Sequence, residues 1–224
     1  MKNYIIEKKS REKKYSFAGI EVSIFDPVPD DINVKGVLEK VTALVPSPLM
    51  RFINKINVGQ FEILNKRDLD ALYKNKTIYL TNLQKSDYDM LDDIIHEVAH
   101  SVEEEYFDLI YSDEEIKKEF LSKREKLREI LENQGYKIDP KKYQSVSYDI
   151  EFDMFLYEEV GYDKLTSLTS SLFLSPYAAT SLREYFANGF ENIFLSEKAY
   201  QILRRLSPKL FKKLVKLISL EENY

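Results

Sequence analysis

The chain contains no cysteine and no tryptophan, and only two of its 224 residues are histidines. Without cysteine it can form no disulfide, offer no thiol nucleophile, and build neither a Cys-ligated iron–sulfur cluster nor a Cys-type zinc finger. Its six glycines are isolated from one another, so the sequence has no glycine-rich phosphate-binding loop. These absences make the positions of the two histidines unusually informative.

The rest of the composition is that of a globular chain. Hydrophobic residues make up 44% of the sequence and charged residues 32%, with a formal net charge of −5. This apolar fraction is too high for a disordered chain, and the length is sufficient to bury a core. The mild acidity argues against a protein that grips nucleic acid along its length.

No part of the sequence resembles a membrane span or an export signal. No stretch approaches the roughly 20 apolar residues that a transmembrane helix needs. The apolar run at residues 4–6 is far shorter than the core of a signal peptide. We therefore expect a soluble protein that is either cytoplasmic or secreted with its signal already removed.

Charge is distributed unevenly along the chain. Residues 85–119 carry thirteen acidic side chains against three lysines, whereas residues 198–216 carry seven basic side chains and no acidic one. The acidic stretch is either a set of solvated helix faces or a cleft rim that selects basic peptides. The basic, amphipathic segment 208–220 either covers the domain core or contacts an anionic membrane surface or a partner.

Hydrophobic periodicity predicts an α+β fold in one domain, residues 1–224, with a small mixed sheet and a mostly helical C-terminal half. We divide it into a polar arm (1–14), an N-terminal α/β part (15–82), two long helices (83–134), an insertion (135–175) and a helical part (176–224). Strands are expected at 20–25, 52–58 and 77–81, and helices at 34–44, 69–73, 86–107, 113–133, 181–195, 198–206 and 208–220. We expect the strand at 77–81 to be an edge strand beside the helix at 86–107.

Both histidines lie in one pentapeptide, His96-Glu97-Val98-Ala99-His100. Residues four apart share one face of a helix, so the two imidazoles can reach the same metal ion. Glu97 is offset by one residue, the position from which a carboxylate can act as general base beside that metal. The alternative is a pair of helix histidines packed for structural reasons.

A catalytic zinc site usually has three protein ligands, and in this chain the third must be Asp or Glu. Glu103, on the same helix, would strain the tetrahedral geometry. Glu184 is the better candidate because a carboxylate on the apolar helix at 181–195 needs a partner, although it can also be a surface residue paired with Arg183. Asn188, one turn after Glu184, can accept a hydrogen bond from a ligand histidine and fix its tautomer.

The chain resembles the peptidase domain of anthrax lethal factor and the related secreted Pro-Pro endopeptidases. The resemblance rests on His96-Glu-Val-Ala-His100, on Tyr177 and on Glu184-Tyr-Phe-Ala-Asn-Gly-Phe190. It covers roughly residues 77–107 and 175–217. The sequence departs from the family in two respects, because Asn188 stands where a second Glu is common and the interval from His100 to Glu184 is longer.

The resemblance implies a zincin-like, gluzincin-type fold and a zinc metalloendopeptidase. It makes His96, His100 and Glu184 the zinc ligands, Glu97 the general base and Tyr177 the residue that stabilises the oxyanion. A peptide or protein would be the substrate. Independently of the resemblance, the expected edge strand at 77–81 either pairs with an extended peptide or is an ordinary edge that binds no ligand. The alternatives are a non-catalytic, zinc-stabilised structural or interaction protein and a zinc hydrolase that acts on a non-peptide bond.

Overall fold

The computed structural model describes residues 13–66 and 69–221. Its contacts form two compact units, one that contains the described residues up to Glu105 and one that comprises Tyr106–Leu220. The predicted polar arm at 1–14 falls mostly on residues 1–12, outside the described residues, and the assignment of the chain to a single domain stays a prediction.

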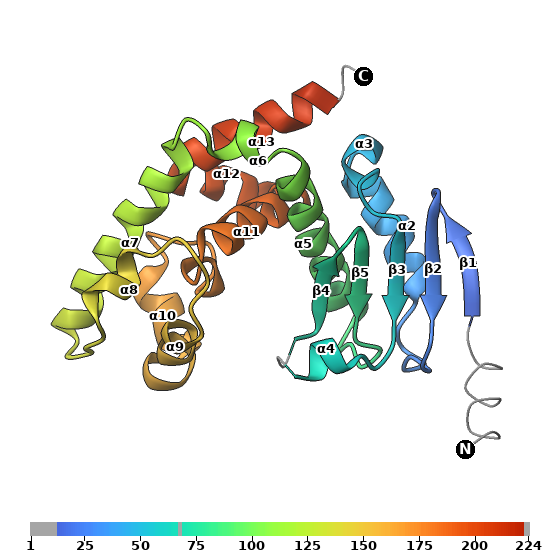
Figure 1. The fold of residues 1–224 in the computed structure, drawn as a ribbon, viewed down its shortest axis with the longest axis horizontal. Coiled ribbons are helices and arrows are strands. Elements are labelled where there is room, and N and C mark those ends of the chain that lie inside the picture. The colour runs from blue at the N-terminus through green and yellow to red at the C-terminus, as the bar shows by residue number, and fades with distance from the viewer. Residues whose placement is uncertain (1–12, 67–68, 222–224) are drawn as a thin grey trace. The chain divides into compact units, whose positions relative to one another are not determined.

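The first unit is built on a five-stranded mixed sheet, which confirms the α+β class (Figure 1). The strands are β1 (Lys13–Phe17), β2 (Ile20–Ile24), β3 (Lys55–Val58), β4 (Ala71–Lys74) and β5 (Thr77–Leu80). Their order is β1-β2-β3-β5-β4, with antiparallel pairs at both edges and parallel pairs in the middle.

Two predictions about this sheet are wrong. Residues 69–73 were expected to form a short helix, but 71–74 are strand β4. Asn75 and Lys76 both have a positive φ, of 50° and 59°, which is the backbone of a two-residue hairpin turn that joins β4 to β5. The strand at 77–81 is therefore internal, and β4 is the edge strand.

A layer of helices covers the sheet of the first unit. It consists mainly of α2 (Val34–Leu44) and the long helix α5 (Asp87–Glu105), and the short helices α3 (Ser47–Met50) and α4 (Glu62–Asn65) lie in connecting segments of the same unit. α5 packs against α2, β4 and β5. The contact is apolar, because Ile56, Ile78 and Leu80 of the sheet and Ile94 and Val98 of α5 are completely buried. Each such side chain contributes about 1.5–3 kcal/mol to folding.

The second unit is entirely helical among its described residues. It contains α6 (Phe107–Tyr111), α7 (Glu115–Asn133), α8 (Pro140–Gln144), α9 (Ile150–Met154), the π-helical turn η1 (Phe155–Val160) and α10 (Tyr162–Thr169). The 3₁₀ turn η2 (Tyr177–Ala179), α11 (Leu182–Leu195), α12 (Glu197–Leu206) and α13 (Pro208–Glu221) follow. Residues 135–175, predicted as an insertion, thus form four short helical elements.

Helix α7 joins the other helices of the second unit through the partly buried Glu119 and the buried Lys123. The Glu119 carboxylate accepts the Tyr185 hydroxyl of α11 at 2.9 Å and the backbone N–H of Lys209, at the start of α13, at 2.9 Å. The Lys123 ammonium donates to the hydroxyl of Ser207. Burial costs these groups their hydration, so each needs a partner, and the partners fix how the helices pack.

Helix α13 buries its apolar face in the core of its unit. Leu210, Leu214 and Leu217 are at most 1% exposed, and Gly189 of α11 lies directly against Leu210. This favours core covering over membrane contact for segment 208–220. Among the described residues, no helix is both long and apolar enough to cross a bilayer.

Replacement of Gly189 by alanine tests this contact. An added Cβ would meet Leu210 Cδ2 at 2.5 Å, so we expect Gly189→Ala to lower the free energy of unfolding by about 1–2 kcal/mol in urea denaturation. Helix propensity alone would raise the free energy of unfolding by about 1 kcal/mol, so a decrease would show that the clash with Leu210 dominates. In a Leu210→Ala background, which removes the clash, Gly189→Ala should no longer destabilise.

Candidate metal centre

The helix that carries both histidines begins where the sequence predicted. The Ser86 hydroxyl accepts the backbone N–H of Asp89 at 3.1 Å and so caps α5. Aspartates in the first turn suit the positive end of the helix dipole. Ten residues after Ser86, His96 is half-buried and His100 is 6% exposed, with ring centroids 4.9 Å apart. The two imidazoles therefore lie side by side on one face.

Glu97 faces the sheet edge. Its carboxylate is 6% exposed, and Oε2 accepts the backbone N–H of Tyr73 in β4 at 2.5 Å. This N–H belongs to the edge strand, which has a neighbouring strand on one side only. The hydrogen bond fixes the orientation of the carboxylate next to His96 on the helix.

Glu103 is an acidic neighbour of His100 on the same helix. Its Oε2 lies 3.5 Å from His100 Nδ1, and both side chains are more than nine-tenths buried. A carboxylate on Nδ1 favours the tautomer whose Nε2 is left to coordinate a metal. Sequence reasoning considered Glu103 only as a ligand and missed this supporting position, which the i,i+3 spacing could have indicated.

Glu184 lies in the first turn of α11. Ser181 caps this helix, because its hydroxyl accepts the backbone N–H of Glu184 at 3.1 Å. The next residues, Tyr185 and Phe186, are buried in the apolar core, whereas Glu184 is only partly buried. The cap and the buried aromatic residues together hold the first turn, and with it the Glu184 backbone, in a defined position.

His96, His100 and Glu184 form the one group in the described residues whose ligand atoms are close enough to hold a metal ion. One atom from each lies within 4.8 Å of the other two. Two imidazoles and one carboxylate are the ligand set of many catalytic zinc sites, which keep a fourth position open. The residues present therefore fit zinc.

Tyr177 begins the turn η2, seven residues before Glu184. The Tyr177 carbonyl accepts both the backbone N–H and the hydroxyl of Thr180, at 3.0 Å and 2.8 Å. Burial raises the pKa of the Tyr177 hydroxyl well above its usual value, and the negative charges of Glu184 and Asp153 raise it further. The hydroxyl therefore keeps its proton at neutral pH and can act as a hydrogen-bond donor.

Asn188 is buried one turn after Glu184. Its side-chain amide donates to Glu191 Oε1 at 2.6 Å, and its backbone carbonyl accepts the Asn192 amide at 2.8 Å. The side-chain N–H is thus directed along its own helix, and the side-chain oxygen is the acceptor that a ligand histidine would use. A supporting role for Asn188 stays a prediction.

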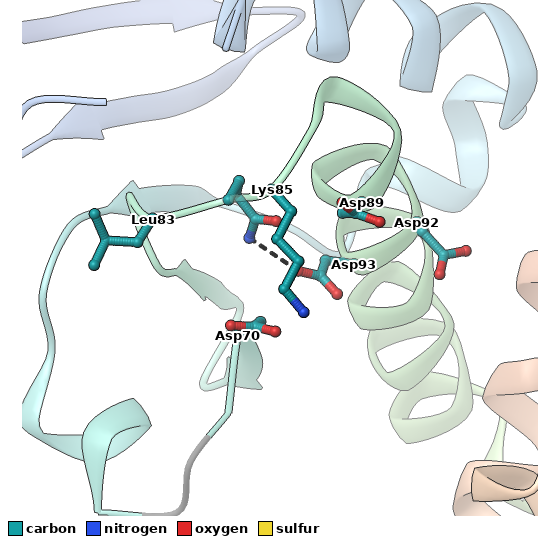
Figure 2. Close-up of a pocket in the computed structure, with 7 residues that line it drawn as sticks. Asp70, Leu83, Lys85, Asp89, Asp92 and Asp93 are labelled. Atoms are coloured by element: carbon teal, nitrogen blue, oxygen red, sulfur yellow. Dashed lines mark hydrogen bonds between the residues drawn. The ribbon is translucent and has the colours of Figure 1, made fainter. Parts of the chain in front are cut away.

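The acidic stretch is not one surface. Asp70, Asp89, Asp92 and Asp93 line a pocket with Leu83, Gln84 and Lys85, and Figure 2 shows Lys85 extended among the carboxylates. Glu114 and Glu115, by contrast, pair with lysines of the second unit. Burial, opposed by a hydrogen bond from Gln84, raises the pKa of Asp93 to about 7, and the charge of Asp70 adds to the rise.

This raised pKa predicts how stability depends on pH. Because Asp93 binds its proton more tightly when folded, its contribution to the free energy of unfolding should fall as pH rises from about 4 to about 7 and level off above that. Asp93→Asn removes this titration and should lessen the fall between pH 5 and pH 8 by about 2 kcal/mol. Urea denaturation at both pH values measures it, and equal slopes in variant and wild type would contradict the assignment.

Removal of the opposing hydrogen bond gives a second test of the same carboxyl. Gln84 Nε2 donates to Asp93 Oδ2 at 2.9 Å, which favours the ionised form. Gln84→Ala should therefore move the fall in stability to higher pH rather than abolish it.

No protein-family model matches this chain, and no curated protein matches it either. The resemblance to lethal factor and the Pro-Pro endopeptidases therefore stays a prediction from the motif residues.

Proposed function

We propose that this chain is a zinc-dependent endopeptidase of the zincin type. The observation that carries the proposal is the grouping of His96, His100 and Glu184, with ligand atoms within 4.8 Å of one another. The adjacent Glu97 adds to it, because a purely structural metal site has no use for a carboxylate beside its ligands. In this proposal the three grouped residues hold the metal.

The chain's own residues then take distinct roles in peptide hydrolysis. A zinc ion held by the three ligands would polarise the scissile carbonyl and lower the pKa of water at the site. Glu97 takes the proton of the attacking water and passes it to the leaving amine. The Tyr177 hydroxyl donates a hydrogen bond to the oxyanion that develops on the carbonyl.

The substrate backbone has a natural docking place at β4. This strand is the sheet edge, and it contacts the helix that carries Glu97. An extended peptide can add to such an edge through main-chain hydrogen bonds, which need no particular side chains. In this proposal β4 takes the role that the sequence had assigned to residues 77–81.

The roles of Glu97 and His96 are separable by mutation. Glu97→Gln keeps the ligand set and should bind one zinc per chain, while peptide hydrolysis falls by about 100-fold or more. His96→Ala removes a ligand and should lose both zinc and activity. Zinc content by mass spectrometry of the native protein and cleavage of a peptide library, with and without chelator, measure both effects.

The isosteric Glu104→Gln, on the exposed side of the same helix, is the matched control for the loss of a carboxylate. It should keep full zinc content and full activity. Equal turnover by wild type and Glu97→Gln would refute the protease assignment.

Tyr177→Phe removes only the hydroxyl. We expect kcat to fall by about 10- to 100-fold with little change in zinc affinity, because the hydroxyl is assigned to the transition state and not to the metal. Tyr157→Phe is the control, since Tyr157 lies in the same unit and is 61% exposed. Steady-state kinetics on one cleaved peptide would show it, and unchanged turnover would remove Tyr177 from the mechanism.

One observation favours a second candidate, a zinc-stabilised protein that does not cut. Glu97 is almost completely buried and already accepts the Tyr73 N–H, as a purely structural glutamate would. In that case zinc would raise the melting temperature of wild type and Glu97→Gln alike, and no peptide in the library would be cleaved.

A further inference from the structure

Arg124 of α7 is one of the largest completely buried side chains of the protein. It is 1% exposed, and its guanidinium carbon lies 3.9 Å from the centroid of the Phe152 ring in α9. Its partners are backbone carbonyls: Nη1 donates to Ala179 and Thr180, and Nη2 donates to Lys142. This is an arginine placed to hold chain segments together.

Two of these carbonyls belong to the segment that joins the proposed oxyanion donor to the proposed third ligand. Ala179 and Thr180 lie between Tyr177 and Glu184, immediately before the cap residue Ser181. Two residues after Thr180, the backbone N–H of Leu182 donates to the carbonyl of Val146 at 2.9 Å. The segment is therefore held by α7 on one side and by residues 135–175 on the other.

A contribution to stability does not by itself explain why an arginine is buried at position 124. A buried cation loses most of its hydration, and carbonyl dipoles replace that loss less well than a carboxylate does. Among the described residues, Arg124 Nε is also buried without a hydrogen-bond partner, which costs about 1–3 kcal/mol. What the guanidinium supplies is geometry, because its rigid fork can fix several carbonyl oxygens at once.

We propose that Arg124 is a positioning residue, which holds the 177–184 segment so that Tyr177 and Glu184 have fixed places. The proposal rests on the proposed function and adds a role for the insertion. Residues 135–175 complete the socket of the guanidinium, with the Lys142 carbonyl as acceptor and the Phe152 ring as the surface it stacks on. In this proposal residues 135–175 support the site indirectly, because they hold the guanidinium that holds the 177–184 segment.

The test is a double-mutant cycle on zinc affinity, a readout that does not depend on turnover. Arg124→Lys keeps a cation of similar length but loses the fork, so the segment is held at fewer points. We expect it to weaken zinc binding about 10-fold in the wild-type background, through a less well-placed Glu184. In the Glu184→Ala background that ligand is absent, and Arg124→Lys should have no further effect.

Two further measurements separate positioning from general destabilisation. Arg128→Lys is the matched control, because Arg128 lies one turn later on α7 and pairs with Glu125 and Glu132 at the surface; it should leave zinc affinity unchanged. In peptide cleavage at zinc saturation, Arg124→Lys should lower kcat about 10- to 100-fold in wild type and much less in Tyr177→Phe. Circular dichroism confirms that each variant is folded at the assay temperature.

The possible results of these measurements distinguish positioning by Arg124 from general destabilisation and from failure of the protease assignment. Equal losses of zinc affinity with and without Glu184 would mean that Arg124 acts on the whole fold, and the proposal would be overturned. Coupling to Glu184 in a protein that binds zinc but cleaves no peptide would support the positioning role and refute the protease assignment. A wild-type protein that binds no zinc would refute both. Should Arg124→Lys not fold, Arg124→Gln, which keeps amide donors, replaces it in the same cycle.

Discussion

The candidate site depends on one helix, α5. Its nineteen residues include both the apolar side chains that pack in the core and the histidines and glutamate of the site. Its apolar stripe, with Ile94, Val98 and Val102 completely buried, is fixed against the rest of the first unit. The helical period then places His96 and His100 together on a second stripe. A third stripe places Glu97 against the edge strand β4, where the Tyr73 N–H holds it. Core packing thus determines where the imidazoles and the carboxylate lie.

In the second unit the corresponding constraint is the burial of Lys123 and Arg124 on α7, together with the partial burial of Glu119. Glu119, Lys123 and Arg124 lie close together on the helix, and each reaches a different partner segment. Because an unsatisfied buried charge is very costly, these contacts allow few alternative packings of η2 and α11. Contacts with α7, rather than the short segment's own sequence, therefore determine where Tyr177 and Glu184 lie in this unit.

Local patterns in the sequence were sufficient to predict the long helices and the place of the two histidines. Periodicity and capping residues predicted α5, α7, α11 and α13 to within a few residues, and the histidine spacing located the two imidazoles that lie close to Glu184. The prediction failed at β4. Leu69, Leu72 and Tyr73 fit a short helix locally, whereas pairing with β5 and the turn at Asn75 and Lys76 make 71–74 a strand. Such pairing depends on a partner that the segment itself does not reveal.

The supporting residues were harder to foresee for a related reason. Arg124 looks like any charged residue of an amphipathic helix, and its partners are backbone carbonyls, which have no sequence signature. Glu103 was considered only as a ligand, although its i,i+3 spacing from His100 could have indicated the contact with Nδ1 that the structure shows. Side-chain identity can indicate which metal and which base to expect. The residues that hold the metal ligands and the base in place, such as Arg124, act through contacts between segments far apart in the sequence.

The hydrogen bond from Tyr73 to Glu97 gives the proposed mechanism a final physical consequence. An edge strand that both orients the general base and receives the substrate links the two events, because a peptide added to β4 restrains the strand whose N–H holds Glu97. β4 pairs with β5 on one side only, so a peptide added to its other side would hold the strand, and with it the carboxylate, at more points. Hydrogen bonds in a free enzyme commonly tighten in this way once substrate is bound. The buried state of Glu97, which by itself would suit a structural residue, is therefore equally compatible with a base that substrate binding brings into alignment.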